Sequence, residues 1–145
     1  MRSQFEKEFD RLGICGKEIL PGEIWTVKDE IIIIPETRLP GFKGTEHEYR
    51  PIVILSCQED CKDPQTITVV ICPLTTRTDI VHQTDCFLSV MEGSVKEESL
   101  AHLGLIQPIL KADLVEKKGQ LTKEQFDSVK TIILMNFGFI PRTEP

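Results

Sequence analysis

The chain has 145 residues, a length that suits one domain with a hydrophobic core. Its 40% hydrophobic and 28% charged residues do not fit a disordered chain, and no apolar run approaches the roughly 20 residues of a membrane-spanning helix. The net charge of −6 argues against non-specific coating of nucleic acid, which requires clustered Lys and Arg. Because the opening MRSQFEKEFDRLG is charged, unlike a secretory signal, we expect a cytoplasmic protein of a single domain, residues 1–145.

The five cysteines predict neither a disulfide scaffold nor a metal centre. Their number is odd and their spacing is loose, which favours reduced thiols. Cys57 and Cys61 form a C-x3-C pair, but no second local pair completes a zinc knuckle. We therefore expect no metal and no cofactor.

Residues 3–13 predict a short N-terminal helix. Ser3 and Glu6 form a capping box, and Gly13 ends the helix. Three apolar residues share one helical face: Phe5, Phe9 and Leu12. We assign residues 1–20 to an N-terminal helical extension that docks on the rest of the protein.

Short apolar runs separated by polar segments predict a small β-barrel or sandwich. The first strand is PGEIWTV, followed by the β-branched run from Ile31 to Ile34, which stops at Pro35. A long loop covers residues 35–51, which hold too many turn residues and charges for a strand. The remaining predicted strands are PIVILS (51–56), TITVVICPL (66–74), CFLSV (86–90) and the less regular LGLIQPIL (103–110).

A second helix is predicted near the C-terminus, in LTKEQFDSVKTIILMNFG. Thr122 and Gln125 form a second capping box, and Gly138 and Pro141 end the helix. The apolar residues at helical spacing are Phe126, Val129, Ile133 and Phe137. We expect this face to pack on the core of the barrel.

The order of the strands predicts which polar residues meet at one end of the sheet. If strands 51–56 and 66–74 are antiparallel neighbours, the start of the first lies beside the end of the second. Opposed residues in such a pair have Cα atoms about 4.5 to 5.5 Å apart. This sheet end would then display Arg50, Thr75, Thr76 and Arg77. Taken alone, an arginine such as Arg50 is more often an ordinary solvated charge at a strand end than a catalytic residue.

Four motifs in order give the chain a resemblance to the MazF/PemK (Kid) toxins over residues 21–137: PGEIWTV, GTEHEYRPIVILS, TVVICPLTT and LTKEQFDSVKTIIL. The resemblance implies a mainly β, SH3-like small barrel of the MazF/PemK/CcdB type with a C-terminal helix, to which this chain adds the N-terminal helix and a tail, residues 138–145. It also implies a homodimeric toxin of a type II toxin-antitoxin system. Such toxins cut single-stranded RNA at short sequences without a metal, and a disordered antitoxin tail covers their RNA site.

Site residues follow from the same resemblance. Arg50 matches the family's arginine before the proline, and Thr75 matches its Thr or Ser after the strand end; both are expected to be catalytic. Glu46 matches the glutamate of the family's loop motif and is expected to support them. A guanidinium can give two charge-assisted hydrogen bonds to phosphate oxygens, and a threonine hydroxyl can give a third. Further RNA contacts are expected from Thr76, Arg77, His47, Lys43 and Tyr49.

Two positions depart from the family pattern. Gly104 and Ile106 stand where some members have an arginine and an aspartate, which leaves the proton donor and acceptor unassigned. His47 is the best substitute base, because imidazole in general exchanges protons near neutral pH. The insertion between Val27 and Gly44 can reshape the RNA groove or the antitoxin surface. The alternative function is therefore a barrel of the same shape without nuclease chemistry, acting as a protein-binding module or growth regulator.

Overall fold

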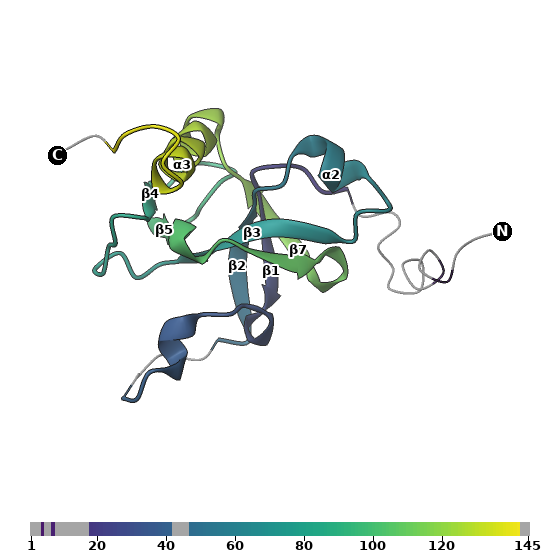
Figure 1. The fold of residues 1–145 in the computed structure, drawn as a ribbon, viewed down its shortest axis with the longest axis horizontal. Coiled ribbons are helices and arrows are strands. Elements are labelled where there is room, and N and C mark those ends of the chain that lie inside the picture. The colour runs from purple at the N-terminus through teal and green to yellow at the C-terminus, as the bar shows by residue number, and fades with distance from the viewer. Residues whose placement is uncertain (1–3, 5–6, 8–17, 42–46, 143–145) are drawn as a thin grey trace.

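The structure is a computed structural model that describes Gln4, Lys7, residues 18–41 and residues 47–142. These residues form one curled antiparallel sheet with a helix near the C-terminus (Figure 1). The predicted N-terminal helix, except Gln4 and Lys7, lies outside the described residues, and so do Lys43 and Glu46. No helix within the described part of the chain is long and apolar enough to cross a membrane.

The sheet has seven strands with the order β4-β5-β3-β2-β1-β7, and β6 pairs with β3. The strand at its centre is β3, which bonds to β2 along one edge and shares its other edge between β6 and β5. All pairs are antiparallel, and the sheet curls into a half-barrel, as the predicted fold class requires. The strands are β1 Glu23–Lys28, β2 Tyr49–Ile54, β3 Thr68–Thr75, β4 Cys86–Leu88, β5 Ser99–Ala101, β6 Gln107–Leu110 and β7 Glu116–Gln120.

Within residues 18–41 and 47–142, two α-helices and four 3-10 helices connect or flank the strands: η1 Asp29–Ile31, η2 Pro35–Arg38, α2 Gln58–Lys62, η3 Leu103–Leu105, η4 Lys111–Asp113 and α3 Lys123–Asn136. The C-terminal helix α3 confirms its predicted cap. The Thr122 hydroxyl accepts a hydrogen bond from the Gln125 backbone N–H, and the Gln125 side chain accepts one from the Thr122 backbone N–H. Together these bonds satisfy two N–H groups that a helix start otherwise leaves without partners.

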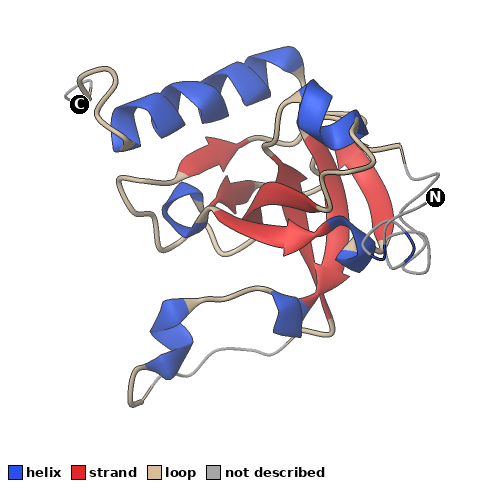
Figure 2. Ribbon diagram, turned by 45° about the vertical axis from the view of Figure 1, so that its right-hand side comes forward, coloured by secondary structure: helices blue, strands red, loops and turns tan. Residues whose placement is uncertain are grey.

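Alternation along the strands gives the sheet one core cluster on each face. Ile52 and Ile54 pack in the first cluster with Trp25, a core residue that is only 7% exposed. Val53 packs in the second cluster with Val129 of α3. Figure 2 shows α3 lying across one side of the sheet, while the segment with η1 and η2 extends from the opposite side.

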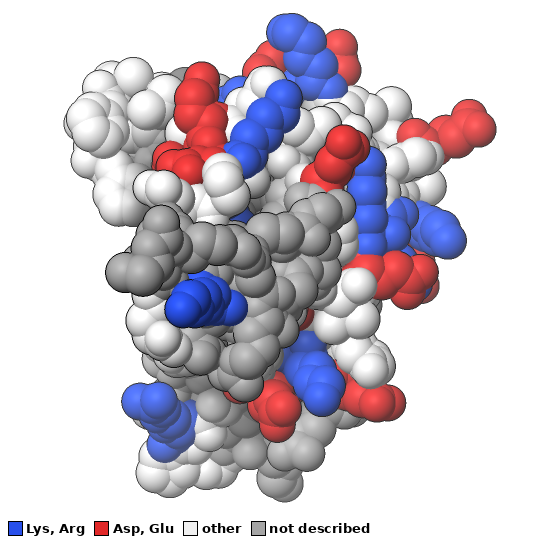
Figure 3. Space-filling model, turned by 90° about the vertical axis from the view of Figure 1, so that its right-hand side faces the viewer, with Lys and Arg blue, Asp and Glu red and all other residues white. Residues whose placement is uncertain are grey.

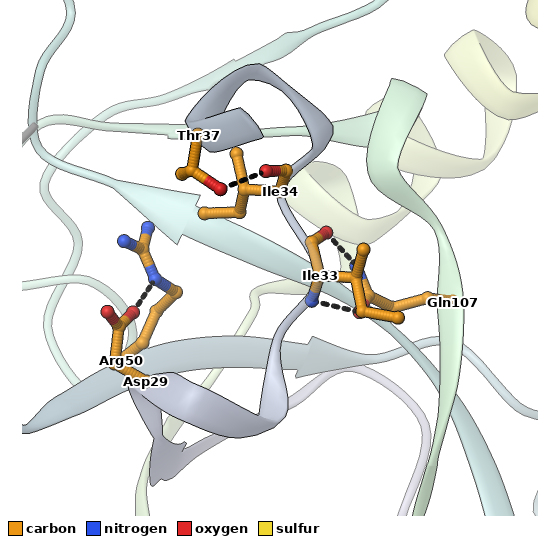
Figure 4. A network of polar contacts seen from close by, with 6 residues as sticks. All are labelled: Asp29, Ile33, Ile34, Thr37, Arg50 and Gln107. Carbon is orange, nitrogen blue, oxygen red and sulfur yellow. Dashed lines mark hydrogen bonds and ion pairs between the residues drawn. The ribbon is translucent and has the colours of Figure 1, made fainter. Parts of the chain in front are cut away.

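The isoleucine run 31–34, whose β-branched residues favour a strand, does not belong to the sheet. Ile31 ends η1, and no residue of the run pairs with a neighbouring strand. Ile32 is buried in the first core cluster, whereas the backbone of Ile33 bonds to the Gln107 side chain (Figure 4). The run is apolar because it covers the core, not because it belongs to the sheet.

The predicted strand 103–110 is only half correct. Its first part is η3, and pairing with β3 begins at Gln107. The chain also has two strands that no apolar pattern predicted: β5, with only three residues, and β7, whose sequence is EKKGQ.

Gly119 lets β7 pass close to a neighbouring loop. The register between β1 and β7 shifts by a bulge between Ile24 and Trp25, and Gly119 lies opposite Ile24. A Cβ atom added at Gly119 would lie 2.8 Å from the carbonyl oxygen of Gly93 and 2.9 Å from that of Ser94. Only glycine fits this close approach without movement of the backbone.

Lys111 is a buried cation that ties η4 to α2. Only 2% of the residue is exposed, and its ammonium donates to the backbone carbonyls of Asp60 at 2.6 Å, Asp63 at 3.1 Å and Cys61 at 3.3 Å. Burial lowers the pKa of the Lys111 ammonium. Its three donors replace the solvation that burial removes.

Candidate active site

Arg50 lies near the start of β2, opposite Val27 of β1. Its side chain is only 14% exposed, and its Nε donates a hydrogen bond to Asp29 Oδ1 at 2.6 Å. Asp29 follows β1 directly and begins η1, so the insertion supplies this partner. The terminal amino groups of Arg50 point away from Asp29 and have no partner among the described residues (Figure 4). They are therefore available to an anion.

Thr75 ends β3 at the same end of the sheet. The pairing of β2 with β3 ends at Ile52 and Pro73; Arg50 and Thr75 lie two residues beyond this pair along their strands, where Thr75 pairs with Leu100 of β5. Residues opposed in an antiparallel pair point to the same face. The Thr75 hydroxyl accepts a hydrogen bond from the Arg77 backbone N–H at 3.2 Å, which leaves its own hydrogen free to donate. The sheet thus places a guanidinium and a hydroxyl on one face at one end.

The other predicted RNA contacts lie around this end without converging on Arg50. His47 is exposed in the loop before β2, and Tyr49 is 43% exposed and points to the opposite face from Arg50 by strand alternation. Thr76 is exposed beyond the end of β3. Arg77 is paired with Asp79 at 3.1 Å.

Charge does not gather into a single-sign patch on the face of the molecule in Figure 3, where basic and acidic side chains are interspersed. An exposed pair such as Arg77 and Asp79 contributes little to stability, since solvent screens it. The mixed surface agrees with the negative net charge and leaves recognition of an anion to local groups such as Arg50.

The two positions that depart from the family pattern contain no proton-transfer group. Gly104 lies in η3 close to the Thr84 side chain, and Ile106 is half-buried against the second core cluster. Neither residue offers a titratable atom to the site.

Sequence reasoning missed two acidic partners. One is Asp29, which is 21 residues away from Arg50. The other is Asp85, whose carboxylate lies 3.2 Å from the His102 ring, 17 residues away. No local motif links either pair, and only the folded loops bring them together. His82, which was expected on the surface, is exposed.

The fold and this sheet end agree with one family. Residues 21–137 match the family described as PemK-like, MazF-like toxin of type II toxin-antitoxin system, and the chain belongs to that family. The match covers the residues over which the sequence motifs predicted it. Comparison with curated protein sequences gives no match.

Several solved structures have a similar fold, and three of them come from mycobacteria. An endoribonuclease from a Mycobacterial species has a TM-score of 0.62 and 16% identity, with 88% of this chain and 97% of that chain covered. The Mycobacterium tuberculosis toxin MazF-mt6 has a TM-score of 0.58 and 19% identity, with 79% and 95% covered. A third structure is an endoribonuclease in complex with its cognate antitoxin from a Mycobacterial species, with a TM-score of 0.60 and 16% identity, and 88% and 99% covered. These likenesses confirm a MazF-like fold.

Proposed function

We propose that this protein is the toxin of a type II toxin-antitoxin pair and that it cuts single-stranded RNA at short sequences without a metal ion. Membership of the PemK-like, MazF-like toxins supports the first part, and the endoribonuclease names of similar structures support the second. The observation that carries the chemistry is the sheet end at which Arg50, anchored through Nε alone, lies level with Thr75.

The proposed reaction is transfer of the RNA phosphate to its neighbouring 2′-oxygen. The 2′-hydroxyl loses its proton, its oxygen bonds to phosphorus, and the bond from phosphorus to the 5′-oxygen breaks. Negative charge then grows on the non-bridging oxygens, and hydrogen-bond donors placed in advance stabilise it. The terminal amino groups of Arg50 and the hydroxyl of Thr75 are these donors. Loss of one donor of this kind costs about 10²–10³ in rate.

Cleavage of a mixed-sequence single-stranded RNA in EDTA tests the proposal. The purified protein, freed of any antitoxin, should give discrete fragments that end in a cyclic phosphate. An RNA with a 2′-deoxy substitution at the cut position should stay intact, because it lacks the attacking oxygen. Arg50→Ala should abolish cleavage, and Arg50→Lys should restore little, since an ammonium lacks the planar fork. An intact RNA after incubation with folded wild-type protein would contradict the proposal.

The partners of the protein belong to the same proposal. An antitoxin segment covers the RNA site, and two copies of the chain form a homodimer. Toxin and antitoxin are both located in the cytoplasm. The solved complex of a similar endoribonuclease with its cognate antitoxin supports the first of these statements. Light scattering of the purified protein tests the second: a monomeric mass at micromolar concentration would contradict a homodimer.

A second candidate function has one observation in its favour. Gly104 and Ile106 bring no proton-transfer group to the site, as expected for a barrel of this shape that acts only by binding another protein. Growth after expression separates the two candidates. A binding module should arrest growth equally well with Arg50→Ala, whereas a nuclease should lose its effect with that change.

A further inference from the structure

His102 and Asp85 form a side-chain pair near the Thr75 end of β3. The Nδ1 atom of His102 lies 3.2 Å from Asp85 Oδ1, and Asp85 Oδ2 accepts a hydrogen bond from the His82 backbone N–H at 3.1 Å. The Asp85 side chain is 2% exposed, and the His102 side chain is 20% exposed. The carboxylate is therefore held at both oxygens, and it fixes the orientation of a ring that still reaches solvent.

This contact suits one tautomer of the ring. A carboxylate accepts hydrogen bonds, so the tautomer with its hydrogen on Nδ1 can donate that hydrogen to Asp85. Nε2 then carries a lone pair, and it has no hydrogen-bond partner among the described residues. A carboxylate that holds Nδ1–H also stabilises the imidazolium that forms when Nε2 takes up a proton. These are the properties of a general base.

His102 and Asp85 lie next to the strands at the Thr75 end of the sheet. Ala101, the last residue of β5, pairs with Leu74 of β3 on one side and with Cys86, the first residue of β4, on the other. Thr75 follows Leu74 within β3. His102 directly follows β5 and Asp85 directly precedes β4, so both border that end of the sheet.

Register places His102 within reach of the proposed site. The His102 backbone N–H donates to the Pro73 carbonyl at 2.9 Å, and Pro73 faces Ile52 of β2. Thr75 is therefore the diagonal neighbour of His102. Such neighbours have Cα atoms about 7–8 Å apart, a span that aromatic side chains bridge. Arg50, Thr75 and His102 thus border one area of the sheet.

We propose that His102 is the catalytic base of the RNA cleavage and that Asp85 is its positioning residue; this inference rests on the proposed function. Nε2 of His102 takes the proton of the 2′-hydroxyl as the 2′-oxygen bonds to phosphorus. The bond to the 5′-oxygen breaks, and that oxygen takes a proton from water. The imidazolium then returns its proton to solvent, which restores neutral His102. His47, the base expected from sequence, is exposed in the loop before β2 and is not the base in this scheme.

Single-turnover cleavage with saturating RNA tests the inference. His102→Gln keeps the size of the side chain and a donor for Asp85 but cannot take up a proton, and its rate should fall by about 10²–10⁴. Asp85→Asn offers its amide hydrogens to Nδ1 and so favours the wrong tautomer, which should also lower the rate by at least about 10². Lys123→Gln, at a side chain that is 85% exposed, is the control and should cut at the wild-type rate.

Two further measurements separate catalysis from folding and binding. Affinity for an uncleavable 2′-deoxy RNA and the melting temperature of each variant should remain close to wild type. Added imidazole should restore part of the rate of His102→Ala but none of that of Arg50→Ala. The inference is overturned if His102→Gln cuts at the wild-type rate, or if its affinity for the analogue falls as much as its rate. If wild-type protein cuts no RNA, the proposed function fails first.

Discussion

Arg50 is anchored to Asp29 through Nε alone, by a hydrogen bond of 2.6 Å between largely buried side chains. A carboxylate that took both terminal amino groups would neutralise the guanidinium and block it. Contact at Nε instead fixes the direction of the side chain, and the two terminal groups point away from the carboxylate (Figure 4). In the proposed reaction Asp29 thus prepares Arg50 for a phosphate group, and the insertion that carries Asp29 belongs to the proposed site.

Asp29→Ala should lower the rate of RNA cleavage by about 10- to 100-fold, because a displacement of a reacting group by about 1 Å costs that much. Asp29→Asn keeps an oxygen that can accept the hydrogen bond from Arg50 Nε, so its cleavage rate should fall less than that of Asp29→Ala. Glu30→Ala, at the exposed position next to Asp29, changes net charge equally and should leave the rate unchanged. Single-turnover rates at saturating RNA make the comparison. Faster cleavage by Asp29→Ala would show that the carboxylate only competes with phosphate.

Lys111→Met should destabilise the fold by about 2–3 kcal/mol, because the carbonyls of Asp60 and Cys61 lose the ammonium as their donor, while the Asp63 carbonyl keeps only the Thr66 backbone N–H. Lys123→Met is the matched control: that side chain is 85% exposed, and its loss should cost less than about 0.5 kcal/mol. Urea unfolding followed by circular dichroism measures both. Equal midpoints for the two variants would contradict a structural role for Lys111.

The stability of the fold should fall as the pH rises from 9 to 11. Burial, with a smaller contribution from Asp85, raises the pKa of the Cys86 thiol from 9.0 to about 11. Between these values the unfolded chain has lost its thiol proton while the folded chain keeps it, so alkali favours unfolding. Cys86→Ala should remove up to about 3 kcal/mol of this decline. Urea unfolding at pH 8 and pH 10.5 gives the difference, and parallel declines for both proteins would refute the assignment.

Lys111 contributes with the opposite sign. Burial lowers the pKa of its ammonium, so its charged form is less favourable in the folded chain. The contribution of Lys111 to the free energy of unfolding therefore rises as the pH increases from its lowered pKa in the folded chain toward the pKa of lysine in the unfolded chain. The comparison of wild type with Cys86→Ala cancels this contribution, since both proteins contain Lys111.

Gly119→Ala should cost about 1–3 kcal/mol, because the added methyl group would lie 2.8 Å and 2.9 Å from two backbone carbonyl oxygens, so the backbone would have to shift. Gly41→Ala is the control: Gly41 has a positive φ of 82° but nothing within 4 Å of its added Cβ. Its cost should be only that of backbone strain, about 1 kcal/mol. Thermal melting ranks the two variants, and a smaller loss at Gly119 would show that β7 shifts easily.

The elements predicted correctly from the sequence are the strands whose side chains are buried and the C-terminal helix, which begins with a capping box. β1, β2, β3 and α3 each combine an apolar pattern with a clear start or stop, and each forms close to its predicted bounds. β7 has no apolar residue, because it is an edge strand held by backbone hydrogen bonds. The isoleucine run 31–34 has the apolar side chains of a strand but is not part of the sheet, since apolar side chains also occur in segments that cover a core.

The same limit applies to the site. The order of two neighbouring strands is enough to predict that Arg50 and Thr75 share an end of the sheet, and the register of β2 and β3 agrees. Side chains that meet only because a loop folds back leave no local pattern. Asp29 and the pair of Asp85 and His102 are of this kind, so they had to be found in the structure.

The side chain of Gln107 holds the insertion to the sheet by bonding to the backbone of Ile33. Its amide accepts from the N–H of Ile33 at 2.8 Å and donates to the carbonyl of the same residue at 3.0 Å, as a neighbouring strand would (Figure 4). These two hydrogen bonds involve only backbone atoms of residue 33. Every amino acid except proline, which has no backbone N–H, can therefore form them at this position. The loop beside Arg50 is thus free to vary in side chains, and so in the ligand shapes that it accepts, while its anchor point stays in place.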